Sequence, residues 1–426
     1  MQRLYRSAFR VAAFLLPVFL ATINTYAKPK EKIIHSFTGG KHGGNPSGML
    51  LPDAAGNLYG VASSGGASQN GLVFELKPSP NGGWKESVLY NFAGDSDGSL
   101  PVSGVTSDPA GNLYGVTAEG GGTGCNTGCG TVYMLKPDGK GHWTEQVLYS
   151  FTGGADGAIP SSPLTVDSAG NVYGTTQYGG NTACDPPSGC GVVFELTPDQ
   201  SGHWTQKVLH AFAGGEDGAL PFLNGVIFDG SGNLYGATPN GGSADSGTVF
   251  EITPTRNGSW KEKVIYEFAG GSDGAFPAAS LVFNGGSLYG TTYAGGNESG
   301  NCPNSGCGTV FQLIPGGGHW TKTTIFAFQG TDGIETLATP VFDLAGNLYG
   351  TTFEGGSGPC SVCGTAFELT PAAGQWQETV LHYFGSRRVD AGTPEAGVLV
   401  DSAGNVFGTT EIGGKAGSGA LFEIRP

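Results

Sequence analysis

A phrase that recurs seven times along the chain constrains its fold more than any other feature. The phrase begins with Asp-x-x-Gly-Asn-Leu-Tyr-Gly, continues to Gly-Thr-Val-Phe-Glu-Leu-x-Pro, and ends with Trp, Val-Leu-Tyr-x-Phe and Gly-Gly-x-Asp-Gly. Successive copies lie 54 to 62 residues apart. Such a period is typical of architectures in which every copy builds the same structural unit. The copies are marked by Asn57, Asn112, Asn171, Asn233, Asn347 and Asn405, with Ser287 in the fifth copy.

Each copy contains four short runs that favour β-strands. In the first copy these runs are 49–51, 58–62, 72–76 and 86–92, and Gly, Pro, Asn or Asp separates them. No segment has a helical period long enough to predict a substantial helix. Four strands in a repeat of this length are typical of a propeller blade. The predicted fold class is therefore an all-β, seven-bladed β-propeller with four-stranded blades, and a linear solenoid is the alternative.

The two ends of the repeat region complement each other. The seventh copy stops at Pro426, after its third strand, and residues 33–37 match the fourth-strand run 88–92. A last blade that takes its outer strand from the N-terminus pairs both ends and leaves no open sheet edge at the seam. A solenoid would not require this complementarity. We therefore predict one propeller domain over residues 28–426, closed by the N-terminal strand.

Residues 1–27 have the pattern of a signal peptide. Three arginines precede an apolar run from residue 11 to about residue 23, and Thr25-Tyr26-Ala27 provides small residues for cleavage. A membrane anchor is the alternative, but the run is short for a span. No later segment is apolar enough to cross a bilayer. We expect an exported protein, extracellular or periplasmic, without a membrane span after cleavage.

The charge of the chain is strongly acidic. Removing residues 1–27, which hold three arginines and no acid, takes the formal net charge from −15 to −18. Such a surface repels phosphate backbones, so nucleic acid is not an expected partner. We expect a monomer.

The repeat resembles the Gloeo/Verruco (GloVer) tandem repeats of secreted bacterial β-propeller proteins. The resemblance covers residues 31–426 and is carried by Gly-Asn-Leu-Tyr-Gly at 56–60, Gly-Thr-Val-Phe-Glu-Ile-Thr-Pro at 247–254 and Gly-Gly-Ser-Asp-Gly at 270–274. It implies a secreted repeat protein. The family brings no agreed activity or catalytic residues, so none is transferred to this chain.

The eight cysteines form four close sequence pairs, all in the loop before the third strand of a repeat. In an exported chain this pattern predicts disulfides that each stabilise one loop. A zinc site or a redox motif is the alternative. Propeller topology places these loops on the same face as the Gly-Gly-x-Asp-Gly turns. The pairs are Cys125/Cys129, Cys184/Cys190, Cys302/Cys307 and Cys360/Cys363.

Five aspartates in these turns are candidate binding residues. Topology suggests a position near the channel opening, where five acids could attract a cation such as calcium. Local hydrogen bonding within each turn is the alternative. These residues are Asp97, Asp156, Asp217, Asp273 and Asp332.

The first and seventh copies depart from this pattern. They carry His42 in one turn and Arg387, Arg388 and Asp390 in the other, and Glu395 is the lone acid in the channel-lining run of the seventh copy. A functional site in a repeat protein often appears as broken symmetry, although an effect of the chain ends also explains it. These five residues complete the candidate binding set.

No motif of a known catalytic centre occurs in the sequence. Six of the seven histidines and most carboxylates occupy repeated positions, which favours a structural role. Six tryptophans that each open a fourth strand indicate blade packing, with stacking on sugars as the alternative. We expect a non-catalytic binding or scaffold protein whose disulfide-bearing face contacts a glycan or a surface protein. The alternative is an extracellular carbohydrate-active hydrolase or lyase.

Overall fold

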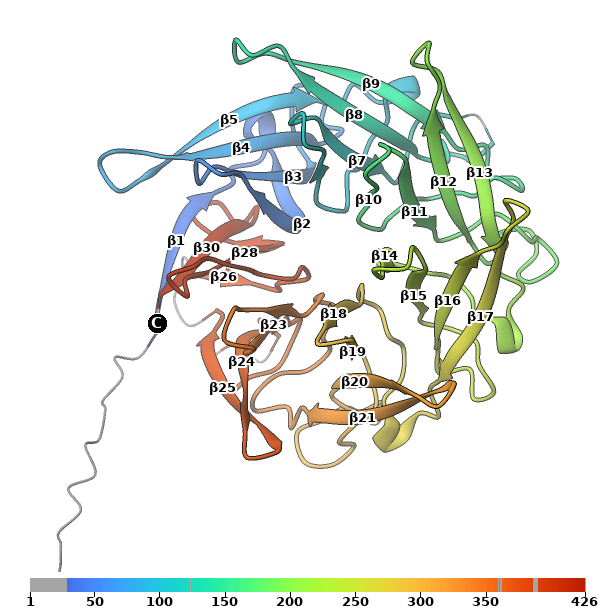
Figure 1. The fold of residues 1–426 in the computed structure, drawn as a ribbon. Coiled ribbons are helices and arrows are strands. Elements are labelled where there is room, and N and C mark those ends of the chain that lie inside the picture. The colour runs from blue at the N-terminus through green and yellow to red at the C-terminus, as the bar shows by residue number, and fades with distance from the viewer. Residues whose placement is uncertain (1–28, 123, 359, 361, 386–389, 426) are drawn as a thin grey trace, which may run out of the picture.

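The computed structural model describes residues 29–122, 124–358, 360, 362–385 and 390–425. Seven four-stranded antiparallel sheets stand around a common axis as the blades of a β-propeller (Figure 1). The predicted all-β, seven-bladed fold is therefore confirmed. Among the described residues there is no α-helix, only four short 3-10 turns. The predicted signal peptide lies outside the described residues. The described part of the chain contains no helix that is long and apolar enough to cross a membrane.

The strands of blades one to six follow each other in sequence order from the axis outward. Blade one holds β2 (Gly44–Pro52), β3 (Leu58–Ser64), β4 (Leu72–Pro78) and β5 (Trp84–Asn91), and blade two holds β6 (Thr106–Ser107), β7 (Leu113–Thr117), β8 (Thr131–Pro137) and β9 (Trp143–Ser150). Blade three holds β10 (Thr165–Val166), β11 (Val172–Thr176), β12 (Val192–Pro198) and β13 (Trp204–Ala211), and blade four holds β14 (Ile227–Phe228), β15 (Leu234–Thr238), β16 (Thr248–Pro254) and β17 (Trp260–Glu267). Blade five holds β18 (Val282–Asn284), β19 (Ser287–Thr292), β20 (Thr309–Gly316) and β21 (His319–Ala327), and blade six holds β22 (Val341–Phe342), β23 (Leu348–Thr352), β24 (Thr365–Ala372) and β25 (Gln375–Tyr383).

Blade seven joins the two ends of the chain. Its inner strands are β27 (Leu399–Val400), β28 (Val406–Thr410) and β30 (Ala420–Arg425), and its outer strand is β1 (Lys30–Ser36) (Figure 1). β1 pairs antiparallel with β30, with a register shift between Ile33 and His35. In blade one the β4–β5 pairing shifts in the same way, at the equivalent position. The predicted closure by the N-terminal strand is therefore confirmed.

The core lies between neighbouring blades. Each outer strand ends in a fully buried phenylalanine that packs on an aromatic ring in the third strand of the next blade. Phe92 meets Tyr133 with 5.0 Å between ring centroids, and Phe37 of the closing strand meets Phe74 at 5.2 Å. Such pairs contribute roughly 0.5–1.5 kcal/mol beyond the burial of their area. The ring is thus held by the same contact at every interface, including the seam.

The repeated Gly-Asn-Leu-Tyr-Gly phrase has a local explanation. Asp53 Oδ1 accepts hydrogen bonds from the backbone N–H groups of Ala55 and Asn57, and Asp53 Oδ2 accepts one from Asn57 Nδ2 at 2.7 Å. This closes the turn between the first two strands. The final glycine, Gly60, lies against the Phe74 ring, where a Cβ atom would come within 2.6 Å of Cζ.

Candidate functional site: the loop face and the channel opening

Two sets of loops share one face of the propeller, which we call the loop face. They are the loops between second and third strands and the connections from each outer strand to the next blade. All eight cysteines lie in the first set and form the four predicted disulfides: Cys125–Cys129, Cys184–Cys190, Cys302–Cys307 and Cys360–Cys363. The disulfide interpretation is therefore confirmed.

The disulfides hold a contact between blades. In each cysteine-containing blade the carbonyl of the second cysteine accepts a hydrogen bond from the connection that enters the next blade. Ile159 N–H donates to the Cys129 carbonyl at 2.8 Å, and Leu220 N–H donates to the Cys190 carbonyl at 2.9 Å. In blade one, which has no cysteine, the Asn70 carbonyl accepts the equivalent hydrogen bond from the Leu100 N–H. Each short disulfide thus fixes an acceptor at a blade interface.

The donors in these contacts have an unusual backbone conformation. All seven are residues other than glycine in the left-handed region, with φ between 51° and 61°. Such a conformation costs roughly 1–2 kcal/mol for a side chain with a Cβ atom. Hydrogen bonds to neighbouring segments hold it: Ile159 N–H donates to the Cys129 carbonyl, and the Ile159 carbonyl accepts from Gln177 N–H. The seven residues are Asn45, Leu100, Ile159, Leu220, Phe276, Glu335 and Thr393.

This feature was missed in the sequence analysis, although a signal for it exists. Six of the seven residues directly precede a proline, which recurs at the start of each channel-lining segment. Proline restricts the residue before it, so a repeated X-Pro pair marks a repeated backbone geometry. The sequence alone did not indicate that the geometry is left-handed.

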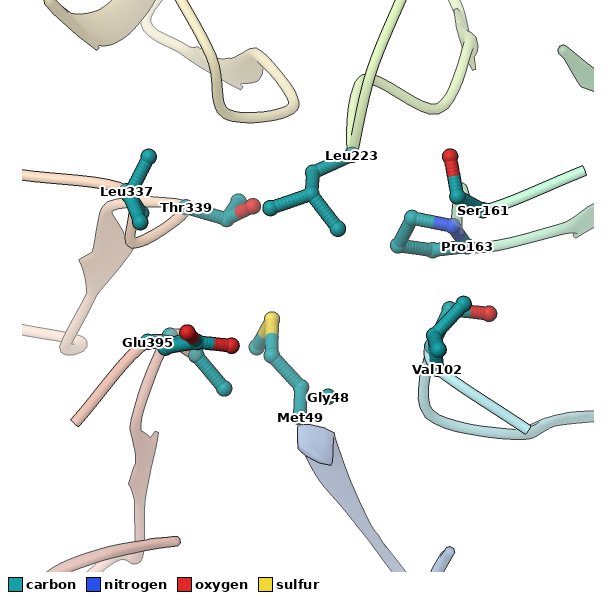
Figure 2. Close-up of a pocket in the computed structure, with 12 residues that line it drawn as sticks. Gly48, Met49, Val102, Ser161, Pro163, Leu223, Leu337, Thr339 and Glu395 are labelled. Carbon is teal, nitrogen blue, oxygen red and sulfur yellow. The ribbon is translucent and has the colours of Figure 1, made fainter. Parts of the chain in front are cut away.

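The central channel opens into a pocket lined by twelve residues (Figure 2). Its empty volume is about 410 Å³, part of which is open to solvent. The lining is mostly small or apolar: Met49 reaches inward from β2, and Leu223 and Leu337 face it across the opening (Figure 2). Glu395 is the one ionisable residue among the twelve. The structure thus places Glu395 in the channel, as the sequence predicted.

Glu395 forms a pair with another acid. Burial, the charge of Glu411 and a hydrogen bond with Glu411 together raise the pKa of the Glu395 carboxyl to about 7, and burial is the largest of these causes. The Glu395 carboxyl is therefore partly protonated near neutral pH, and its hydrogen bond joins it to Glu411. Glycosidases that retain configuration keep their two carboxyl groups about 5 Å apart, with the sugar between them. Direct contact between Glu395 and Glu411 leaves no such gap.

The loop face exposes apolar side chains around the channel. Six large apolar side chains are exposed in the described part of the chain, and four of them belong to this face: Leu100, Phe222, Val362 and Ile412. Phe222 is 38% exposed and stands at the channel end of its connection. In other blades the equivalent position is occupied by a different residue: Ser161 in blade three, Ala278 in blade five and Glu395 in blade seven. The seven-fold pattern is therefore broken where the loop face meets the channel.

The five turn aspartates do not line the channel pocket. Four of them bond to a side chain of the outer strand of their own blade, and Asp332 bonds within its own turn. Asp97 accepts a hydrogen bond from Tyr90 Oη at 2.6 Å, Asp156 from Tyr149 Oη at 3.1 Å, and Asp273 from Tyr266 Oη at 2.7 Å. Asp217 lies 3.1 Å from His210 Nε2, and Asp332 accepts from the Gln329 N–H at 2.7 Å. The expected position near the channel opening was wrong, because each turn folds back on the outer strand.

The remaining candidates do not meet at one site. His42 Nδ1 lies 3.2 Å from Glu86 Oε2, at the interface between blades seven and one. The Asp390 side chain is fully buried beside His382, at the interface between blades six and seven. Arg387 and Arg388 lie outside the described residues. Blade seven therefore separates His42 from Asp390, and Glu395 lies apart from both in the channel.

The tryptophans are on the opposite face and pack between blades. Trp143 meets Tyr59 of the preceding blade edge to face at 6.2 Å, and Trp320 meets Tyr235 at 5.8 Å. The closing strand has Pro29 at the tryptophan position, and Pro29 lines a small hollow beside Tyr349. These contacts favour blade packing as the reason for the repeated tryptophan.

The repeats of this chain match a known protein family. The model of the Gloeobacter/Verrucomicrobia repeat matches residues 20–224 and 182–422. The two matches together span nearly the whole chain, and the fold consists of the repeats that they describe. The chain is a repeat-built β-propeller, and it belongs to the Gloeobacter/Verrucomicrobia repeat family. A search of curated proteins found no match.

Proposed function

We propose that the protein is an exported, non-catalytic binding or scaffold protein that presents its loop face to a glycan or a surface protein. The four disulfides fit an oxidising compartment and make the loops of this face rigid. Rigid loops reduce the entropy that a binding surface loses when it takes up a ligand. We further propose that the protein works as a monomer.

The observation that carries the proposal is the position of the broken symmetry. The blade framework repeats its buried aromatic residues and its turn aspartates. The residues at the channel opening instead change from blade to blade, and they include the exposed Phe222 and the pocket-lining Met49 and Glu395. Exposed aromatic and apolar groups beside a polar rim are typical of binding surfaces. A ligand that seats on the opening would contact side chains of several blades at once.

The geometry favours binding over the hydrolase or lyase. Catalysis on a glycan needs an acid and a base on either side of the scissile bond. Among the residues that line the channel pocket, Glu395 is the single acid, and its partner Glu411 touches it directly. The turn aspartates that could have supplied further carboxylates bond to their own outer strands or within their own turns.

Thermal unfolding of mature 28–426 against a panel of polysaccharides tests the proposal. A ligand at about a hundred times its dissociation constant should stabilise the fold by roughly 2.7 kcal/mol. We expect at least one glycan to raise the melting temperature of the wild type and to lose most of this effect in Phe222→Ala. Leu344→Ala is the matched control, because Leu344 is an exposed apolar side chain in the turn between β22 and β23, on the opposite face.

Two results would contradict the glycan form of the proposal. One is a panel without any shift, which would leave surface proteins as the candidate partner. The other is a shift that Phe222→Ala retains in full, which would place the site away from the channel opening. Parallel samples with calcium or EDTA test the predicted calcium binding, and Asp156→Asn shows whether any calcium effect comes from the turn aspartates.

A further inference from the structure

Six of the seven interfaces between blades contain the same three-residue slot, and at the seam between blades seven and one His42 takes the place of the acid. The first member of the slot stands two residues before the buried phenylalanine that ends an outer strand, and its second is the acidic position of the following turn. The third member stands two residues after the tryptophan position on the outer strand of the next blade. Between blades one and two these members are Tyr90, Asp97 and Glu145. We call this arrangement the interblade slot.

One interblade slot contains a cation supplied by the chain. Between blades four and five, Lys322 holds the third position, and its Nζ lies 3.0 Å from Asp273 Oδ1. The Lys322 side chain is only 3% exposed. Tyr266 completes the slot by donating its hydroxyl to Asp273. The slot can therefore accommodate a buried positive charge next to its aspartate.

The slot between blades three and four has a different set of groups. His210 on β13 replaces the tyrosine, and Glu262 on β17 replaces the lysine. His210 Nε2 lies 3.1 Å from both Oδ1 and Oδ2 of Asp217. One ligand atom from each of the three residues lies within 4.8 Å of the other two. Glu262 Oε1 is buried without a hydrogen-bond partner of its own, although the Glu262 carboxyl forms a hydrogen bond with Asp217.

This arrangement needs a positive charge. Two carboxylates so close together repel each other unless a proton or a cation lies between them. In the salt bridges of the described residues, Asp217 is paired only with His210. In the slot between blades four and five the third position is Lys322, but here the third position is a second acid, Glu262. The charge must therefore come from a proton or from a bound ion.

We propose that His210, Asp217 and Glu262 bind a divalent transition-metal ion, for which Zn²⁺ has the most suitable chemistry. One imidazole nitrogen and two carboxylate oxygens form a ligand set that Zn²⁺ takes, with water at the fourth position. The ion would connect β13 to β17, the outer strands of two neighbouring blades. It would take the role of the Lys322 ammonium in the equivalent slot and stabilise the ring, since it binds the folded chain.

The same ligand types meet at one other interface. Glu31, His382 and Asp390 also bring one ligand atom each to within 4.8 Å of the others. Glu31 belongs to β1, the closing strand, and it occupies the third position of the slot between blades six and seven. Histidine at the first position thus occurs together with an acid at the second and third positions in two separate interfaces. This recurrence supports a common purpose for the set.

Isothermal titration of the EDTA-treated mature chain with Zn²⁺ tests the site. We expect His210→Tyr to bind one ion fewer per chain than the wild type. Tyrosine is the residue at this position in three other slots, so this variant should keep the fold. His203→Tyr is the control, because it removes an exposed histidine on the opposite face and should leave the number of ions unchanged. Zn²⁺ should also raise the melting temperature of the wild type more than that of His210→Tyr.

Two outcomes would overturn the proposal. If the EDTA-treated wild type takes up no Zn²⁺, a proton bridges the carboxylates and the slot is not a metal site. If His210→Tyr binds the same number of ions with unchanged affinity, the ions bind elsewhere. Should His210→Tyr fail to fold, Glu262→Gln decides the matter, because glutamine occupies this position as Gln206 in blade three. None of these results depends on the ligand of the loop face.

Discussion

At the scale of single residues, burial determines what Glu395 contributes to the fold. Burial is the main reason that the pKa of Glu395 lies near 7, and Glu411 adds to it. The unfolded chain exposes the same carboxyl to water, where its pKa is ordinary. A group whose pKa is higher in the folded state favours folding while it is protonated. This contribution is lost as the pH rises through about 7.

The first prediction concerns this pH dependence. Glu395→Gln keeps the shape of the side chain and removes the ionisation, so the variant should be more stable than the wild type at pH 8.5. The expected gain is on the order of 1–3 kcal/mol, from a shift of somewhat more than two pH units. At about pH 3.5, below the ordinary pKa of the carboxyl, the difference should disappear. Urea unfolding at both pH values measures this, with the exposed Glu298→Gln as the control.

The turn aspartates show the limit of residue-level prediction. Their repetition correctly suggested local bonding as one explanation, since each accepts a hydrogen bond within its turn or from its outer strand. These aspartates follow an outer strand and precede a channel-lining segment. Their sequence position therefore did not show whether they face the outer strand or the channel. The contact between Glu395 and Glu411 was not predictable either. Glu395 precedes the first strand of its blade and Glu411 follows the second, and no repeated sequence spacing marks such a pair of acids.

At the scale of elements, the disulfide loops and the left-handed residues form one unit. Each disulfide fixes a carbonyl, and that carbonyl holds the N–H of a residue whose conformation is otherwise unfavourable. Strands and cysteine pairs were predictable from the sequence, because alternation, turn residues and local spacing encode them. The left-handed residues were not, because their conformation depends on hydrogen bonds to a neighbouring blade.

The second prediction tests this unit. The double variant Cys125→Ser/Cys129→Ser should lose about 2 kcal/mol of unfolding free energy, since the closed loop is short. Hydrogen exchange of the Ile159 amide should become clearly faster, because its acceptor is the Cys129 carbonyl. The Leu100 amide, whose acceptor lies in a blade without cysteine, should exchange as in the wild type. Equal acceleration of both amides, or of neither, would contradict the proposed coupling.

At the scale of the whole molecule, seven blades place seven variable connections around one channel. The blade count and the closure followed from the repeat and from the complementary chain ends. The repeated phrases also indicated the family, and the family model confirmed it. The candidate site was harder to predict, because it depends on which connections project side chains at the opening. Phe222 shows this, since its exposure arises from the packing of the ring and not from a motif.

Closure of the ring is the central claim, since β1 completes blade seven and joins the two ends of the chain. Thermal unfolding of the mature chain with and without residues 30–37 tests it most directly. The deletion removes the pairing of β1 with β30 and the buried Phe37, worth several kcal/mol, so the melting temperature should fall by roughly 5 °C or more. A synthetic peptide of residues 28–38 should restore part of the loss. An unchanged melting temperature would contradict the closed propeller.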